Sequence, residues 1–264
     1  MNWLRRFTRT QAPVPETENE NEMDLADAAA HRGDWEAALT IWGPRAQAGD
    51  VRAQNNIGAC FSGGLGVERD PALAVKWLTL ASDAGDPAGQ RNLANMYFRG
   101  EGLPEDPARA AELYRLAADA GDAEAQDMLS WMLLEGEMIP PDTAEALRLA
   151  TAAAVQGMPN AMSRLGMMYH NAIGVERDPA EAVRWWSGAA ARGEEDAQAM
   201  LGAALHMGMG VERDPFMGFV WLLRGHAGDS PLAYPFLRAA EDALSIEEAG
   251  RARRMADEPL EPVP

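Results

Sequence analysis

The chain has 264 residues, of which 47% are hydrophobic, and its formal net charge is -18 at pH 7. This charge argues against a nucleic-acid-binding protein, because a phosphate backbone is bound by a basic surface. It fits a solvated acidic surface and a partner protein with a basic segment. The single cysteine, Cys60, excludes a disulfide framework within the chain. No stretch has the apolar length of a transmembrane helix.

A glycine recurs at a fixed interval through most of the chain. Gly49, Gly85, Gly121, Gly157 and Gly193 are 36 residues apart, and Gly228 follows after 35. A period of this length indicates a stacked repeat protein. We therefore predict five copies of one repeat over residues 51–229, with one residue lost from the fifth copy before Gly228.

Residues 1–22 are predicted to form a disordered tail and linker. The arginines of residues 1–10 are Arg5, Arg6 and Arg9, and the larger apolar side chains there are Trp3, Leu4 and Phe7. This apolar content is too short for a signal peptide, so the cytoplasm is the expected compartment. Residues 11–22 are rich in Pro, Glu and Asn, a composition typical of disorder. The apolar side chains can also share one helical face, which leaves membrane or partner contact as the alternative.

Residues 23–50 are predicted to be two N-terminal capping helices. A shift of 36 residues aligns Asp34 with Asp70 and Ala38 with Ala74, so residues 34–48 should form the second helix. Its partner, near residues 23–31, should be short. We expect a kink or a break in the second helix at Pro44, because proline removes a helical hydrogen bond.

Each repeat is predicted to contain two helices, here named helix A and helix B. In residues 51–63 the apolar and small side chains fall on one helical face. An Asp-Pro pair such as Asp70-Pro71 begins helix B, since aspartate caps free N–H groups and proline suits the first helical position. The recurring glycine is a candidate C-terminal cap. Small residues at the column of Gly58 allow helices A and B to approach closely. The side chains expected to fill the space between successive pairs are Trp77, Leu113, Trp185 and Trp221.

Residues 230–264 are predicted to be C-terminal capping helices followed by a frayed tail. A short helix should follow Pro231. Residues 245–248 read as a capping box, with serine at the first position and glutamate at the fourth, which should open a last polar helix through Met255.

The units resemble Sel1-like repeats, which are relatives of the tetratricopeptide repeat. Residues 161–169 (AMSRLGMMY) and 174–193 (GVERDPAEAVRWWSGAAARG) match the family pattern column by column. The resemblance covers residues 51–229. It implies an all-α fold, a right-handed α-solenoid of stacked antiparallel helix pairs, in which helix A lines a concave groove.

The helix-A positions opposite the predicted core are the candidate protein-binding residues. Asparagine can pair with a peptide backbone, arginine with a carboxylate, and methionine offers adaptable apolar contact. Trp131 occupies a column that elsewhere holds Ala59, Asn95, Met167 and Ala203, so the repeat's own packing does not require its size. The alternative for the methionines is packing between helices. The candidates are Asn55, Asn56, Arg91, Asn92, Asn95, Arg99, Asp127, Met128, Trp131, Arg164, Met167, Asn171, Met200 and Met207.

No catalytic, cofactor or metal site is predicted. His170 and His206 share a column of adjacent helices A, roughly 8–10 Å apart, which is too far for one metal ion. The Gly-x-Gly-Val turns lack the lysine and the preceding strand of a phosphate-binding loop. The column of Cys60 holds methionines in the next three repeats, so we interpret this cysteine as a core residue.

The sequence therefore predicts a non-enzymatic adaptor or scaffold that binds a protein or peptide through its concave helix-A surface. Two alternatives remain. One is a membrane-associated regulatory protein docked through residues 1–10. The other is a β-lactamase-like hydrolase, an activity associated with some cysteine-rich Sel1-like proteins. Those proteins pair cysteines within each repeat, so the lone Cys60 counts against the second alternative.

Residues 1–10 give a first testable prediction. We expect the intact chain not to sediment with acidic vesicles, because one short segment on a strongly acidic body is a weak anchor. A vesicle cosedimentation assay measures this. Salt-sensitive cosedimentation that is abolished by deletion of residues 1–10 would contradict the prediction.

Overall fold

The computed structural model describes residues 16–260, and their side chains from residue 21 onward. Residues 16–260 contain fourteen helices and no strand. Within the chain two compact units meet in sequence between Ala125 and Gln126. The predicted all-α fold of stacked helix pairs is confirmed. The predictions for residues 1–15 and 261–264 lie outside the described residues.

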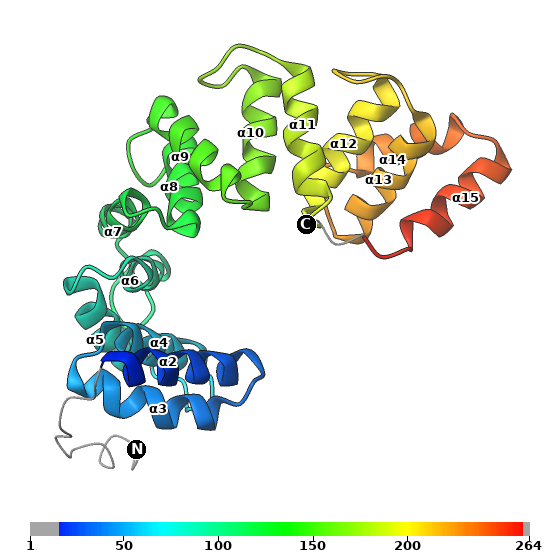
Figure 1. The fold of residues 1–264 in the computed structure, drawn as a ribbon. Helices are drawn as coiled ribbons and strands as arrows, with labels where there is room; N and C mark the ends of the chain where they lie inside the picture. The colour runs from blue at the N-terminus through cyan, green and yellow to red at the C-terminus, as the bar shows by residue number, and fades with distance from the viewer. Residues whose placement is uncertain (1–15, 261–264) are drawn as a thin grey trace. The chain divides into compact units, whose positions relative to one another are not determined.

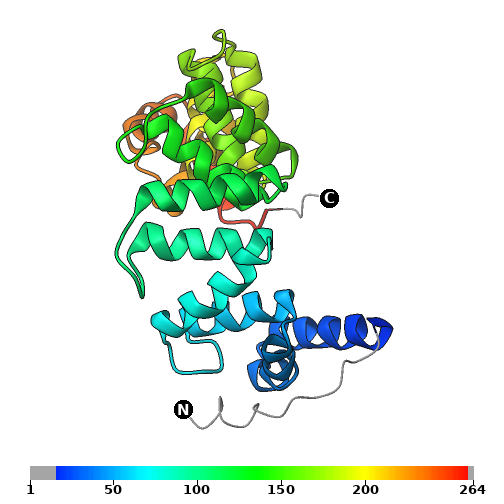
Figure 2. The same ribbon diagram turned by 90° about the vertical axis from the view of Figure 1, so that its left-hand side faces the viewer.

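In the first unit each helix lies beside the helix that follows it in the chain (Figures 1 and 2). α2 and α3 precede the repeats, α4 and α6 are helices A, and α5 and α7 are helices B. The helices are α2 (Glu16–His31), α3 (Trp35–Ala48), α4 (Val51–Gly63), α5 (Pro71–Asp83), α6 (Pro87–Arg99) and α7 (Pro107–Asp119).

The second unit contains the remaining repeats and the C-terminal helices. α8, α10 and α12 are helices A, and α9, α11 and α13 are helices B. From α9 to α14 each helix contacts the next, and α15 also packs on α13. The helices are α8 (Ala123–Glu135), α9 (Thr143–Val155), α10 (Pro159–Asn171), α11 (Pro179–Ala190), α12 (Glu195–Met207), α13 (Pro215–Ala227), α14 (Tyr234–Asp242) and α15 (Ile246–Ala256).

The helices begin and end at the capping residues that the sequence predicts. The Asp70 side chain accepts a hydrogen bond from the Leu73 N–H at the start of α5. Gly49, Gly85, Gly121, Gly157 and Gly193 all have φ between 84° and 97°, which lets the chain reverse directly into the next helix A. The repeat boundaries therefore follow from aspartate caps and left-handed glycines.

The last repeat corrects the prediction of a lost residue. Gly228 has φ of -85°, whereas Asp229, 36 residues after Gly193, has φ of 65°. The Ser230 N–H then donates to the Gly225 carbonyl, as the Asp86 N–H donates to Ala81 in an earlier repeat. The 36-residue period is intact, and aspartate stands in the glycine column. Aspartate is one of the few residues other than glycine that occasionally adopt this conformation.

The N-terminal helix is longer than the sequence predicts. α2 begins at Glu16, so residues 16–22 are helical and the prediction of a linker there is wrong. Glutamate is a good helix former, and acidic residues near a helix N-terminus are favourable. Glu22 forms an ion pair of 2.6 Å with Arg45 of α3. α3 runs through Pro44 as one helix, so the chain is not broken there.

Helix A approaches helix B closely at the glycines of the small-residue column. A Cβ added to Gly166 would lie 2.2 Å from Nε1 of Trp186, and one added to Gly58 would lie 2.6 Å from Cγ of Leu78. The predicted close approach is confirmed. Of the large side chains predicted between successive pairs, Leu113 is buried, and the half-buried Trp185 and Trp221 pack against the core. The residue after each tryptophan is more deeply buried, as Leu78 after Trp77 and Trp186 after Trp185 show.

The C-terminal helices follow the sequence prediction. The Ser245 side chain accepts from the Glu248 N–H, and the Glu248 side chain accepts from the Ser245 N–H, which completes the capping box of α15. α14 and α15 both pack on α13 and cover its apolar face, which includes Phe219 and Leu222. They close this end of the core.

Because each repeat packs only on its neighbours, a core substitution in the centre of the array should cost more stability than one near its end. Leu129 is 0% exposed, whereas Leu244 near the C-terminus is half-buried. We expect Leu129→Ala to lower the free energy of unfolding by about 2–5 kcal/mol, because it leaves a cavity. Leu244→Ala should cost less. Urea melts of the two variants measure this, and equal losses would argue against a one-dimensional array.

Candidate functional site

The asparagines of the first unit bond to one another across successive helices. Asn92 of α6 donates from Nδ2 to Oδ1 of Asn55 of α4, at 2.7 Å. Asn55 donates to Asn56 at 3.4 Å, and Asn56 donates to Asp27 of α2 at 3.1 Å. The chain of side chains links α2, α4 and α6. These amides therefore hold neighbouring repeats together.

Two more candidates in this unit also have partners within the chain. Arg91 forms ion pairs with Asp122 at 2.7 Å and with Glu124 at 3.2 Å. Asn95 accepts a hydrogen bond of 2.5 Å from the Tyr114 hydroxyl. Burial raises the pKa of Tyr114, so this hydroxyl stays protonated and can donate. Arg99 is exposed.

In the second unit an ion pair joins the positions that correspond to Asn55 and Asn92 of the first unit. Arg164 of α10 bonds to Asp127 of α8, a separation of 37 residues that equals the separation of Asn92 and Asn55. Asp127 is only 6% exposed, so its charge needs this partner. Sequence reasoning missed the pairing, although complementary side chains 37 residues apart were a signal for it.

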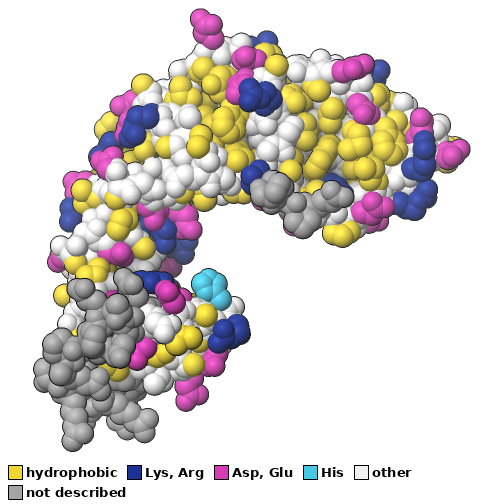
Figure 3. Space-filling view, in the orientation of Figure 1, with side chains coloured by type: hydrophobic (Ala, Val, Ile, Leu, Met, Phe, Trp, Pro, Cys, Tyr) yellow, Lys and Arg dark blue, Asp and Glu magenta, His cyan; other side chains and the backbone are white. Residues whose placement is uncertain are grey.

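The apolar candidates of the second unit come together in a hollow, which we call the α8–α12 hollow. Its volume is ≈ 610 Å³. Trp131 of α8, Met167 of α10 and Met200 of α12 line it, and all three are half-buried. Figure 3 shows hydrophobic side chains at the surface of this unit, over α11 to α14, with acidic side chains among them. Three successive helices A thus contribute to one apolar surface.

The polar lining of the α8–α12 hollow is mostly acidic. Glu135, Glu194, Glu195 and Asp196 are four carboxylates, against the single guanidinium of Arg164. The acidic residues were not among the sequence candidates. Glu194 occupies the capping column of Asp50 and Asp86, so its pattern indicated only a helix start.

Glu194 is a half-buried carboxylate that accepts hydrogen bonds from two residues. Burial raises its pKa, while hydrogen bonds from the Ala197 N–H and the Ser163 hydroxyl oppose the rise, and Asp196 and Glu195 add to it. Asp196 accepts a hydrogen bond of 2.6 Å from the Ser230 hydroxyl. Glu194 and Asp196 are therefore held by hydrogen bonds to α12 itself, to α10 and to the turn after α13, and we call the four carboxylates of the hollow the acidic wall.

Four candidates of the second unit do not line the hollow, and one of them is the buried Asp127. Met128 is half-buried, and Asn171 and Met207 are exposed near the C-terminal ends of α10 and α12. The residues brought together are thus Trp131, Arg164, Met167 and Met200, with Leu232 beside them as an addition that the sequence did not indicate.

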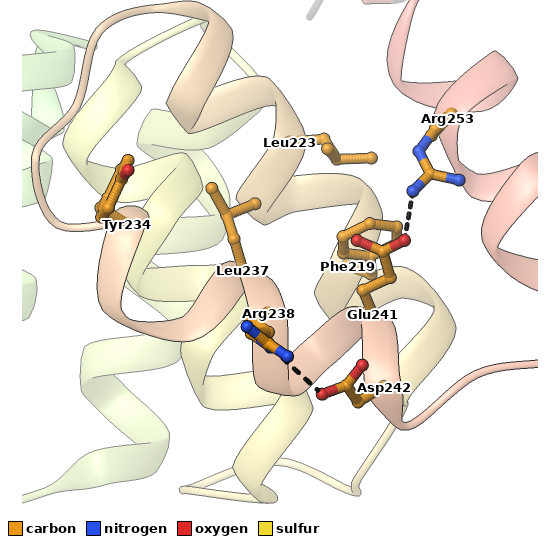
Figure 4. A pocket seen from close by; sticks show the side chains of 8 residues that line it. All are labelled: Phe219, Leu223, Tyr234, Leu237, Arg238, Glu241, Asp242 and Arg253. Carbon is orange, nitrogen blue, oxygen red and sulfur yellow. Dashed lines mark hydrogen bonds and ion pairs between the residues drawn. The ribbon is translucent and has the colours of Figure 1, made fainter.

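A second hollow, of ≈ 600 Å³, lies against α13, α14 and α15 (Figure 4). Its apolar side chains include Phe219, Leu223 and Leu237. Two ion pairs occur at its edge, Arg253 with Glu241 and Arg238 with Asp242, the latter at 3.8 Å. Its charges are thus balanced internally, unlike those of the α8–α12 hollow.

The remaining chemistry-bearing residues form no reactive arrangement in the described part of the chain. Cys60 is buried, and burial raises the pKa of its thiol from 9.0 to about 11. A thiol with this pKa is a poor nucleophile at neutral pH. Residues 16–260 contain no group of three or more His, Cys, Asp or Glu side chains arranged to hold a metal ion. No described helix is long and apolar enough to cross a membrane.

Comparison with known proteins gives a consistent family match. The Sel1 repeat model matches residues 51–86, 87–122, 123–158, 159–194 and 195–225. A solved Sel1 repeat protein from Oxalobacter formigenes is 25% identical, with 92% of this chain and 99% of that chain covered and a TM-score of 0.75. One from Klebsiella pneumoniae is 21% identical, with 75% and 97% covered and a TM-score of 0.49. A search of curated proteins gives no match.

The Asp127–Arg164 pair predicts a stability effect that a ligand-binding arginine would not have. Arg164→Ala should lower the free energy of unfolding by about 3–5 kcal/mol, because it leaves a buried carboxylate without its partner. The exposed Arg99 is the matched control, and Arg99→Ala should change stability by no more than about 0.5 kcal/mol. Urea melts at neutral pH measure both variants. Equal, small losses would show that Asp127 does not depend on Arg164.

Proposed function

The chain belongs to the Sel1 repeat family, whose fold commonly serves protein–protein interaction, and we propose that this protein is a non-enzymatic adaptor or scaffold. It binds a segment of a partner protein through its helix-A surface. Repeat arrays of this kind expose extended surfaces formed by successive units, which suit a protein or peptide better than a small molecule.

One observation carries the proposal: three successive helices A contribute to the α8–α12 hollow. Trp131 is the largest apolar side chain in it, and tryptophan is enriched among the residues that dominate binding energy. Apart from the exposed Arg99, the polar helix-A candidates of the first unit are instead bonded to other side chains of the chain. The second unit is therefore the better binding region.

The buried, protonated thiol of Cys60 gives no support to the hydrolase alternative. Hydrolysis of a chromogenic β-lactam by the purified chain would support it. The proposed place of action is the cytoplasm, which cell fractionation tests. Residues 1–10, on which the membrane alternative depends, lie outside the described residues.

Site-specific photocrosslinking tests the proposal. A photoreactive amino acid placed at Asn160, an exposed position that lines the hollow, should crosslink to a partner protein in cells. The same amino acid at Thr151, exposed on α9 outside the hollow, should not. Crosslinks from Thr151 alone would place binding on the other helices and refute the proposal.

The matched substitutions are Trp131→Ala and Met207→Ala. Trp131→Ala should weaken binding of the captured partner by about thirtyfold, equivalent to about 2 kcal/mol, if Trp131 is an anchor. Met207 belongs to the same predicted surface but does not line the hollow, so Met207→Ala should leave binding unchanged. Circular dichroism of both variants separates loss of contact from loss of fold.

A further inference from the structure

The α8–α12 hollow combines an apolar surface with an acidic one. Trp131, Met167 and Met200 form the apolar part, and Glu194 to Asp196, at the start of α12, form the acidic part together with Glu135 of α8. A ligand that fills the hollow must therefore satisfy both surfaces at once.

The carboxylates of the hollow have no cation of their own. Among residues 21–260, Glu135, Glu194, Glu195 and Asp196 form no ion pair with any arginine or lysine. The one guanidinium in the lining, Arg164, is bonded to the buried Asp127. Negative charge thus remains uncompensated beside an apolar surface, and an incoming cation would meet complementary charge.

We propose that the hollow binds a protein segment in which arginine or lysine stands beside an aliphatic or aromatic side chain. This inference rests on the proposed function and names the chemistry of its partner. The apolar side chain packs on Trp131 and the methionines, while the cation faces Glu195 and its neighbours. Methionine is flexible and polarisable, so the surface accepts more than one apolar side chain.

The probe is a labelled peptide of about ten residues in which arginines alternate with leucine and tryptophan, and the readout is fluorescence anisotropy with the full chain. We expect saturable binding that weakens when salt rises from about 0.05 to about 0.5 M, because screening reduces charge attraction. Two control peptides replace all arginines by glutamate or all apolar residues by serine, and both should bind at least tenfold more weakly.

Two charge reversals separate the local site from the general acidity of the chain. Glu195→Lys should weaken the arginine peptide by about tenfold. Glu212→Lys changes the net charge equally, but Glu212 is exposed in the turn after α12, at the opposite end of that helix from Glu195, and should leave affinity unchanged. Equal weakening by both variants would refute the proposed site.

A pH titration adds a third readout. A cation attracts the ionised form of a carboxylate, so affinity should fall as the pH drops and these carboxylates take up protons. Burial raises the pKa of Glu194, so its charge is lost at a higher pH than that of a free glutamate. Affinity that stays constant down to about pH 4 would contradict a role for the acidic wall.

The chain's own residues 1–10 carry three arginines and three large apolar side chains, so they are a competing occupant. Equal affinity of the full chain and of a chain without residues 1–10 supports an external partner. Tighter binding after the deletion would assign the hollow to the chain's own segment and overturn the proposal. Crosslinks from Asn160 to an acidic or uncharged partner segment would overturn it too, while leaving the adaptor function standing.

Discussion

The close approach of helix A to helix B is the constraint on which the rest of the structure depends. At Gly58, Gly166 and Gly202 an added Cβ would lie within 2.2 to 2.7 Å of the facing helix B. This contact leaves no room for a side chain at that one column, so the core between the two helices is filled by side chains on either side of it, such as Leu129 and Leu165 of helices A and Leu78 and Trp186 of helices B. The opposite face of helix A is then free of core packing and can carry either inter-repeat bonds or a binding surface.

Most of the fold could be predicted from the sequence because the features that repeat depend only on nearby residues. Aspartate caps, left-handed glycines and small residues each act within a few positions, so a 36-residue period reproduces them. The failures occur where the pattern is broken: Asp229 replaces a glycine without changing the register, and α2 extends into residues that read as a linker. The ion pair of Glu22 with Arg45 depends on a contact between helices, which composition does not reveal.

The candidate site could be predicted only in part. Column analysis singled out Trp131 by its size and Met167 and Met200 by their helix-A positions, and the two methionines also pack against the core. It could not separate the asparagines that bond to each other from residues available to a partner, because both have the same polarity and periodicity. The acidic residues of the hollow were not predicted, because Glu194 stands in the capping column and its pattern indicates only the start of α12.

The intact register at Asp229 has a consequence for how the array could grow. Every earlier junction has a glycine with positive φ, and the last junction reaches the same backbone conformation with an aspartate. The chain therefore leaves the fifth unit with the backbone conformation that precedes helix A in the earlier units, and α14 follows at the place in the sequence where a sixth helix A would lie. Lengthening by duplication would require no remodelling of existing units, only the displacement of α14 and α15 by one period. The number of units can therefore change at this end, but such a change also replaces Leu232 of the hollow and the Ser230 hydroxyl that bonds to Asp196.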